Sequence, residues 1–356
     1  MNLQYLSVQI MKKLIKSKIF MKILGVCGAQ GALLFPFKKF LIGNVEPRAQ
    51  FHTEFEEQWV LNFGKVPFLR NLDGINEIPD IIIGSPSCGH SSIFSYSRKK
   101  TLGNPKKDDT LNLYLTSIVK FEPKFFLMEN LPKLLDLIPL EEWHKTLKNY
   151  HIITHCHSVS DLGNSQVSRI RLIMVGIRKD YKPLNKYFDS LFPVCEKKNC
   201  LELYKQVNHS INYKEPDDKV LAMYYYKDPN KQNLTVKQVK ELWNTEFKDE
   251  YKWPIRSKKM NTLPGVYRNR KYGYPMTLRP SNRQFNYLGE VIGLDECRII
   301  MGFPKEFKIH MNTNGLIYWL NKGRNTLTKG ATFEVGIWFK TCLENLLGFS
   351  LKNIKS

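Results

Sequence analysis

Cys88 is the residue of this sequence best placed to act as a nucleophile. The run Asp80-Ile81-Ile82-Ile83 predicts a short buried strand, which Gly84-Ser85-Pro86-Ser87 ends at once. The thiol should therefore lie on a loop just past the carboxyl end of a strand, where open α/β sheets hold reactive groups. A thiol attacks as an exposed thiolate, and the Gly/Ser/His-rich flank favours exposure. A plain loop cysteine is the alternative.

An acid and two arginines stand at later strand boundaries. Glu129 directly follows the apolar run 125–128, where it could hold a proton for a ring nitrogen, although it could also be a capping acid. Arg169 and Arg171 alternate before the apolar run 172–177, so we expect both on one face of a strand start. There they could meet an anion, or form a solvated basic edge.

The N-terminal part carries features of a nucleotide-type cofactor site. A predicted strand at residues 22–27 runs into the tight turn Gly28-Ala29-Gln30-Gly31, whose glycines allow close approach of the backbone. The next predicted strand, 40–45, ends in Glu46, which suits ribose hydroxyls, with a surface acid as the alternative. Asp73 stands at a further polar strand end.

The charge of the chain indicates an acidic partner. The 356 residues are 42% hydrophobic, enough for a substantial core, and their net charge of +21 favours nucleic acid. A generally lysine-rich composition is the alternative. Basic residues and tyrosines concentrate at residues 179–275, which we interpret as a separate recognition lobe; the stretch 256–272 contains no acidic residue.

The seven cysteines and the hydropathy indicate where the protein works. The cysteines show no framework spacing, which favours reduced thiols in the cytoplasm, of a bacterium or of a virus-infected host cell. A zinc site could combine Cys195 and Cys200 with the histidines and Cys156 of residues 151–157, but no pair has good ligand spacing, so no metal is expected. No apolar run reaches the roughly 18–20 residues that span a bilayer, so no membrane partner is expected.

Taken in order, these segments resemble the DNA (cytosine-5) methyltransferase family over about residues 23–178 and 276–347, and the recognition lobe is unmatched. The matching residues share positions in the family's ordered motifs: Gly28-Ala29-Gln30-Gly31, Glu46, Asp73, Gly84-Ser85-Pro86-Ser87-Cys88, Glu129-Asn130-Leu131, Arg169-x-Arg171, Asp295-Glu296-Cys297, Met301-Gly302-Phe303-Pro304 and Lys329-Gly330-Ala331-Thr332. The sequence departs from the family pattern at Gln30 and Ala331, where glycine and asparagine are usual, and at Ser87 and Gly89, where proline and glutamine are usual. Gln166 lies one residue earlier than the family's glutamine.

The resemblance implies an α/β fold with a doubly wound, mostly parallel sheet and a smaller target-recognition domain. It divides the chain into an N-terminal extension (1–20), an S-adenosylmethionine-binding catalytic domain (21–178), a DNA-binding domain (179–325) and a C-terminal helix that returns to the catalytic domain (326–356). Cys88 would attack C6 of a flipped-out cytosine in double-stranded DNA, assisted by Glu129, Arg169 and Arg171.

The resemblance also implies that the methyl donor S-adenosylmethionine is held by Gly28, Gly31, Glu46, Asp73 and Pro86. A monomer without a metal is expected. Two alternatives stay open because the nucleophile loop is atypical. The enzyme could act on RNA or install another C5 group, or the chain could be a degenerate member that only binds DNA.

Overall fold

The computed structural model describes residues 21–47, 49–87, 108–162, 166, 169–184, 197–207, 267–268, 274–275, 284–285, 292–309 and 333–347. These residues belong to two compact units. The sheet unit takes those within 1–162, 170–194 and 330–356, and the second unit takes those within 163–169 and 195–329. The N-terminal extension 1–20 and nearly all of the basic stretch 256–272 lie outside the described residues.

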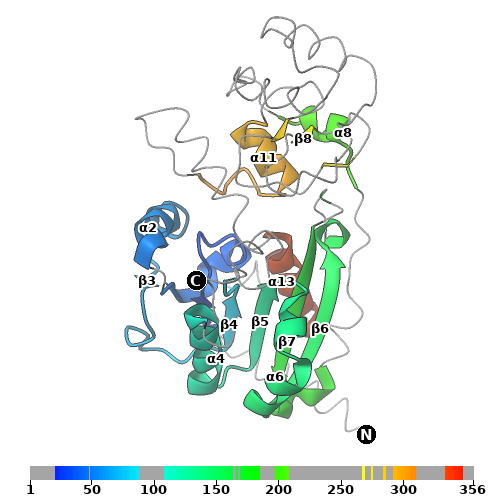
Figure 1. Ribbon diagram of the computed structural model, residues 1–356. Helices are drawn as coiled ribbons and strands as arrows, with labels where there is room; N and C mark the ends of the chain where they lie inside the picture. The colour runs from blue at the N-terminus through cyan, green and yellow to red at the C-terminus, as the bar shows by residue number, and fades with distance from the viewer. Residues whose placement is uncertain are drawn as a thin grey trace, which may run out of the picture. The chain divides into compact units, whose positions relative to one another are not determined.

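A seven-stranded sheet in the order β3-β2-β1-β4-β5-β7-β6 forms the centre of the sheet unit (Figure 1). Its strands are β1 (Ile23–Val26), β2 (Leu41–Val45), β3 (Phe68–Leu69), β4 (Ile81–Gly84), β5 (Phe125–Asn130), β6 (Tyr150–Ser158) and β7 (Ile170–Arg178). Strands β1 to β5 pair in parallel, and β7 runs antiparallel to both of its neighbours. The predicted doubly wound, mostly parallel sheet is confirmed.

Alternating side chains of the strands fill a core on each face of the sheet. Ile23 of β1 and Leu127 of β5 pack with the helices α2 (Ala49–Phe63), η1 (Phe35–Phe40) and α13 (Phe333–Leu347). Leu24 and Met128, one residue further along each strand, pack on the opposite face with α4 (Asp109–Phe121) and α6 (Leu140–Thr146). Apolar residues at consecutive positions are therefore required, as is typical of strands covered on both faces.

Helix α4 begins and ends where its sequence dictates. Asp108 caps the first turn by accepting hydrogen bonds from the backbone N–H groups of Thr110 and Leu111 at 2.9 and 3.1 Å. The helix ends at Phe121, and its C-terminal capping residue Glu122 takes a left-handed conformation with φ 44° directly before Pro123. The capped start places the first turn of α4 beside the loop that follows β4.

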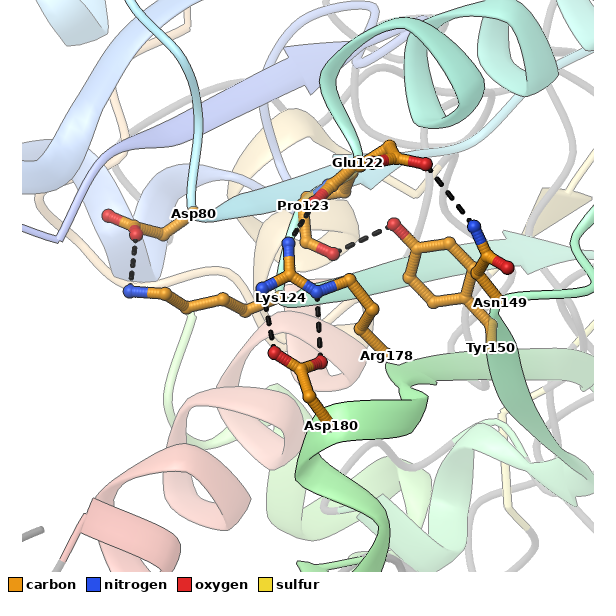
Figure 2. A network of polar contacts seen from close by, with 8 residues as sticks. All are labelled: Asp80, Glu122, Pro123, Lys124, Asn149, Tyr150, Arg178 and Asp180. Atoms are coloured by element: carbon orange, nitrogen blue, oxygen red, sulfur yellow. Dashed lines mark hydrogen bonds and ion pairs between the residues drawn. The ribbon is translucent and has the colours of Figure 1, made fainter.

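A network of polar contacts closes the edge of the sheet where β4 and β5 begin, shown in Figure 2. Lys124 forms an ion pair with Asp80 at 2.8 Å, and the buried hydroxyl of Tyr150 donates to the carbonyl oxygen of Pro123 at 2.8 Å. Arg178 donates two hydrogen bonds to the Asp180 carboxylate, each 2.9 Å long. This hydrogen bonding lowers the pKa of Asp180, whereas burial raises the pKa of Tyr150.

The second unit contributes the helices α8 (Cys200–Tyr204) and α11 (Leu294–Ile300) and the parallel strand pair β8 (Tyr267–Arg268) and β9 (Gln284–Phe285). Short helix α5 (Leu134–Leu137) and the 3₁₀ helices η4 (Val159–Leu162) and η5 (Lys179–Leu184) complete the sheet unit. Among the described residues, no helix is both long and apolar enough to cross a membrane.

Candidate active site

Glu129 is held at both carboxylate oxygens by residues of neighbouring strand segments. Its Oε1 atom forms an ion pair with Nε of Arg171 at 2.9 Å, and its Oε2 atom accepts a hydrogen bond from Oγ of Ser85 at 2.8 Å. The Glu129 side chain is 4% exposed and the Arg171 side chain 15% exposed. A buried carboxylate with a charged partner and a hydroxyl donor has a fixed orientation, as a group that meets a substrate requires.

The strand β5 reaches further than the sequence suggested. It continues through Glu129 and Asn130, whereas the apolar run predicted its end at Met128. The reason is the antiparallel partner β7, which extends the ladder by pairing Ile173 with Glu129 and Leu172 with Asn130. Glu129 is therefore fixed within a strand rather than carried on a loop.

The loop after β4 is hydrogen-bonded to β5 and to α4. Asn130 Nδ2 donates to the carbonyl oxygen of Pro86 at 3.1 Å, and the backbone N–H of Ser87 donates to Oγ1 of Thr110 at 2.8 Å. Pro86 is buried and Ser87 is half-buried. Cys88, the predicted nucleophile, lies outside the described residues, and it directly follows this anchored segment in the sequence.

The turn after β1 has the backbone of a ligand-binding loop. Cys27 and Ala29 adopt positive φ values of 56° and 46°, and Gly31 has φ 86°. A Cβ atom on Gly31 would lie 2.3 Å from the Phe63 ring, and one on Gly28 would lie 2.6 Å from the Leu34 side chain. Both glycines are therefore required by the space that surrounds them.

The end of β2 supports this turn with two buried polar side chains. Asn44 Oδ1 accepts from the N–H of Gly28, and Glu46 Oε2 accepts from the N–H of Ala29, each at 3.2 Å. Within the described part of the chain, Asn44 Nδ2 and Gln30 Oε1 are buried without a hydrogen-bond partner. This donor, this acceptor and the Glu46 carboxylate fit a bound adenosyl compound, which can satisfy them.

The other predicted site residues that the structure describes are Asp73 and Arg169. Asp73 is exposed, and its backbone N–H donates to Asn71 Oδ1 at 3.1 Å. Arg169 is buried and directly precedes β7, so it does not lie on this strand as expected. The strand begins at Ile170, because Ile170 is the first residue that pairs with β6.

Sequence reasoning assigned no role to several residues that hold the site together. Ser85, Thr110, Asp108, Asn130 and Asn44 all make the side-chain hydrogen bonds described above. The available signals were the acid-rich start of the helix at residues 108–110 and the polar residues at the ends of apolar runs. Neither signal names the partner, because each bond joins distant parts of the chain.

No group of three or more His, Cys, Asp or Glu within the described ranges could hold a metal ion. Burial raises the pKa of the Cys200 thiol to about 12, so without a metal this thiol stays protonated at neutral pH. Cys195 lies outside the described residues.

The strand order and the glycine turn after β1 define the methyltransferase fold. The family model of the C-5 cytosine-specific DNA methylases matches residues 44–320, and the chain belongs to this family. The general reaction of this family is methyl transfer to C5 of cytosine with S-adenosylmethionine as the donor. A comparison with curated proteins gave no match.

Solved structures share the fold at low sequence identity. A protein described as a DNA modification methyltransferase of an E. coli prophage gives a TM-score of 0.62 at 15% identity, over 92% of this chain and 99% of that one. The Entamoeba histolytica methyltransferase EhMeth gives 0.57 at 15% identity, over 91% and 98%. The S. pombe Dnmt2 methyltransferase gives 0.52 at 12% identity, over 92% and 98%.

Proposed function

We propose that the protein is a DNA methyltransferase that transfers a methyl group to C5 of a flipped-out cytosine through a covalent bond between Cys88 and C6. The observation that carries the proposal is the orientation of the Glu129 carboxylate. Ser85 and Arg171 hold its two oxygens, and Ser85 belongs to the loop that leads to Cys88. The strand β4, which precedes this loop, and the strand β5, which carries Glu129, are adjacent and parallel.

The chemistry requires both groups. Attack of the Cys88 thiolate on C6 moves an electron pair of the ring toward N3 and C5, which breaks the aromaticity and makes C5 nucleophilic. Glu129 meets N3 with a proton or hydrogen bond as this charge develops. After C5 has gained the methyl group, loss of the C5 proton to a base restores the C5–C6 double bond and expels the thiolate.

Arg171 would have a second task besides orienting Glu129. Its positive charge helps to stabilise the negative charge that develops on the base in the adduct. We assign the same charge-stabilising role to Arg169, on the basis of the sequence resemblance.

The glycine turn and the end of β2 would hold the methyl donor. Gly28 and Gly31 let the backbone approach the ligand, and the fully buried Glu46 suits the ribose hydroxyls. Asp73 would contact the adenine, and Pro86 would line the same site. When bound, S-adenosylmethionine supplies an electrophilic methyl group on a sulfonium sulfur. Once this sulfur has lost the methyl group, it is the neutral thioether of the product.

The substrate we propose is double-stranded DNA, bound by a monomer in the cytoplasm. The net charge of +21 supports a nucleic-acid partner, and membership of a DNA methylase family favours DNA over RNA. A base within a stacked duplex is out of reach of a thiol in a pocket, so the target cytosine must leave the stack. The basic region at 179–325 would read the DNA sequence.

The test is mass spectrometry of nucleosides after incubation of the protein and S-adenosylmethionine with duplex DNA of random sequence, and in parallel with RNA. We expect 5-methyldeoxycytidine with the wild type and with Cys156→Ser, which removes an exposed cysteine of β6. We expect none with Cys88→Ser, although this variant still binds DNA. Methylation of RNA but not DNA would replace the substrate, and full activity of Cys88→Ser would overturn the mechanism.

A further inference from the structure

Thr110, in the first turn of α4, accepts a hydrogen bond that the loop after β4 needs. The backbone N–H of Ser87 donates to its Oγ1 atom at 2.8 Å. Thr110 is 4% exposed, so water cannot readily replace this acceptor. The residue that the resemblance leads one to expect at position 87 is proline, which has a fixed φ angle and no N–H. Serine lacks this constraint and adds a donor that must be satisfied.

Asp108 fixes the orientation of the Thr110 hydroxyl. A hydroxyl has one hydrogen to donate, and that of Thr110 is donated to Oδ1 of Asp108. Its lone pairs are thereby left to accept the N–H of Ser87. The same Asp108 oxygen caps α4, so the acceptor is built into the start of a helix whose Tyr114 and Ile118 are fully buried. The loop is attached to a rigid element.

The backbone of Thr110 also contacts Cys27, the residue directly before the glycine turn that follows β1. The Cys27 thiol donates a weak hydrogen bond to the carbonyl oxygen of Thr110 at 3.4 Å. Cys27 is completely buried and has φ 56° at the end of β1. Thr110 therefore contacts both segments that the proposed reaction requires, the glycine turn after β1 and the loop after β4.

We propose that Thr110, oriented by Asp108, is a positioning residue for methyl transfer, and that its hydroxyl supplies the constraint on the Ser87 backbone that a proline would otherwise supply. This inference rests on the proposed function of Cys88, the next residue in the chain. In this role Thr110 acts through the backbone of the loop.

The test compares a substitution that removes the Thr110 hydroxyl with one that keeps it. Thr110→Val keeps the branched shape and loses the hydroxyl, whereas Thr110→Ser keeps the hydroxyl and loses a methyl group. Thr146→Val, in the exposed last turn of α6, is the matched control, because the Thr146 hydroxyl bonds to a carbonyl of its own helix at 3.1 Å. Amide hydrogen exchange at Ser87 and single-turnover methyl transfer are measured for all three variants and the wild type.

We expect Thr110→Val to speed exchange of the Ser87 amide about tenfold, the effect of losing one hydrogen bond. Methyl transfer at saturating DNA and donor should slow by about the same factor, while the affinities for both substrates stay unchanged. Thr110→Ser and Thr146→Val should behave as the wild type in both measurements.

Two results would overturn the inference. Unchanged Ser87 exchange in Thr110→Val would show that the hydroxyl does not hold the loop. Faster exchange with an unchanged rate of methyl transfer would show that the bond does not position the reacting groups. A wild type that transfers no methyl group would refute the proposed function instead, and Ser87 exchange would still decide whether Thr110 anchors the loop.

Discussion

Ser85→Ala removes one of the two groups that hold the Glu129 carboxylate. In the wild type, Oγ of Ser85 lies 2.8 Å from Oε2, and Arg171 holds the other oxygen at 2.9 Å. The alanine variant leaves a buried carboxylate with one fixed oxygen, so the group can rotate about its remaining contact. We expect Glu129 to spend less time in the orientation that meets N3 of the base.

The size of the effect follows from the charge and the burial of the pair. Hydrogen bonds to charged groups contribute about 1.5–3 kcal/mol, and the half-buried position of Ser85 places this one near the lower end. A loss of about 1.5–2 kcal/mol of transition-state stabilisation corresponds to a rate about 10- to 30-fold slower. Ser85→Thr retains the hydroxyl and should recover much of this loss.

The assay is single-turnover methyl transfer at saturating DNA and S-adenosylmethionine, with the affinities for both measured separately. Ser117→Ala is the matched control, because its fully buried hydroxyl donates to a backbone carbonyl of its own helix at 2.7 Å and not to a charged group. We expect Ser85→Ala to lower kcat with little change in affinity, and Ser117→Ala to leave kcat unchanged. Wild-type kcat in Ser85→Ala would refute the reasoning that both contacts orient Glu129.

Three further predictions concern stability and donor binding. Tyr150→Phe should lower the free energy of unfolding by about 1–2 kcal/mol in urea titrations, because it leaves a buried carbonyl unpaired. Tyr114→Phe should leave this free energy unchanged, since the Tyr114 hydroxyl has no hydrogen-bond partner among the described residues. The hydrogen bond with Arg178 lowers the pKa of Asp180, and this exposed pair contributes under about 1 kcal/mol to stability. The contribution is complete above the unfolded pKa of about 3.9, and it is lost as the pH falls through the folded pKa. Asp180→Asn and the wild type should therefore differ in unfolding midpoint at pH 7 and converge in acid; a difference that persists in acid would contradict this. Gly28→Ala should weaken S-adenosylmethionine binding in calorimetry by about 1–3 kcal/mol, because its methyl group overpacks the turn; unchanged affinity would place the donor elsewhere.

The elements of the fold could be predicted from the sequence because each has a local cause. The apolar runs before Gly28 and Gly84 are short, unbroken and bounded by turn residues, as strands buried on both faces must be. The start of α4 follows from an acidic capping residue before an apolar period. These signals need only neighbouring residues to be recognised.

The contacts within the site could not be predicted because they join distant residues. The hydrogen bond between Ser85 and Glu129 spans 44 positions, and that between Ser87 and Thr110 spans 23. The position of β7 between β5 and β6 decides that Arg171 reaches Glu129, and a sequence pattern does not reveal strand order. Arg169, which was expected at the start of this strand, lies just before it for the same reason, since strand pairing decides where β7 begins.

Trapping the bond between Cys88 and cytosine C6 tests the proposed mechanism most directly. In a duplex of random sequence that carries 5-fluorocytosine, C5 has no proton to lose, so the enzyme cannot be released after methyl transfer. We expect a protein–DNA complex that survives denaturation in the presence of S-adenosylmethionine, with the nucleotide attached to the peptide that contains Cys88, and no complex with Cys88→Ser. Attachment to another residue, or methylation of ordinary DNA without a trapped complex, would contradict the covalent mechanism.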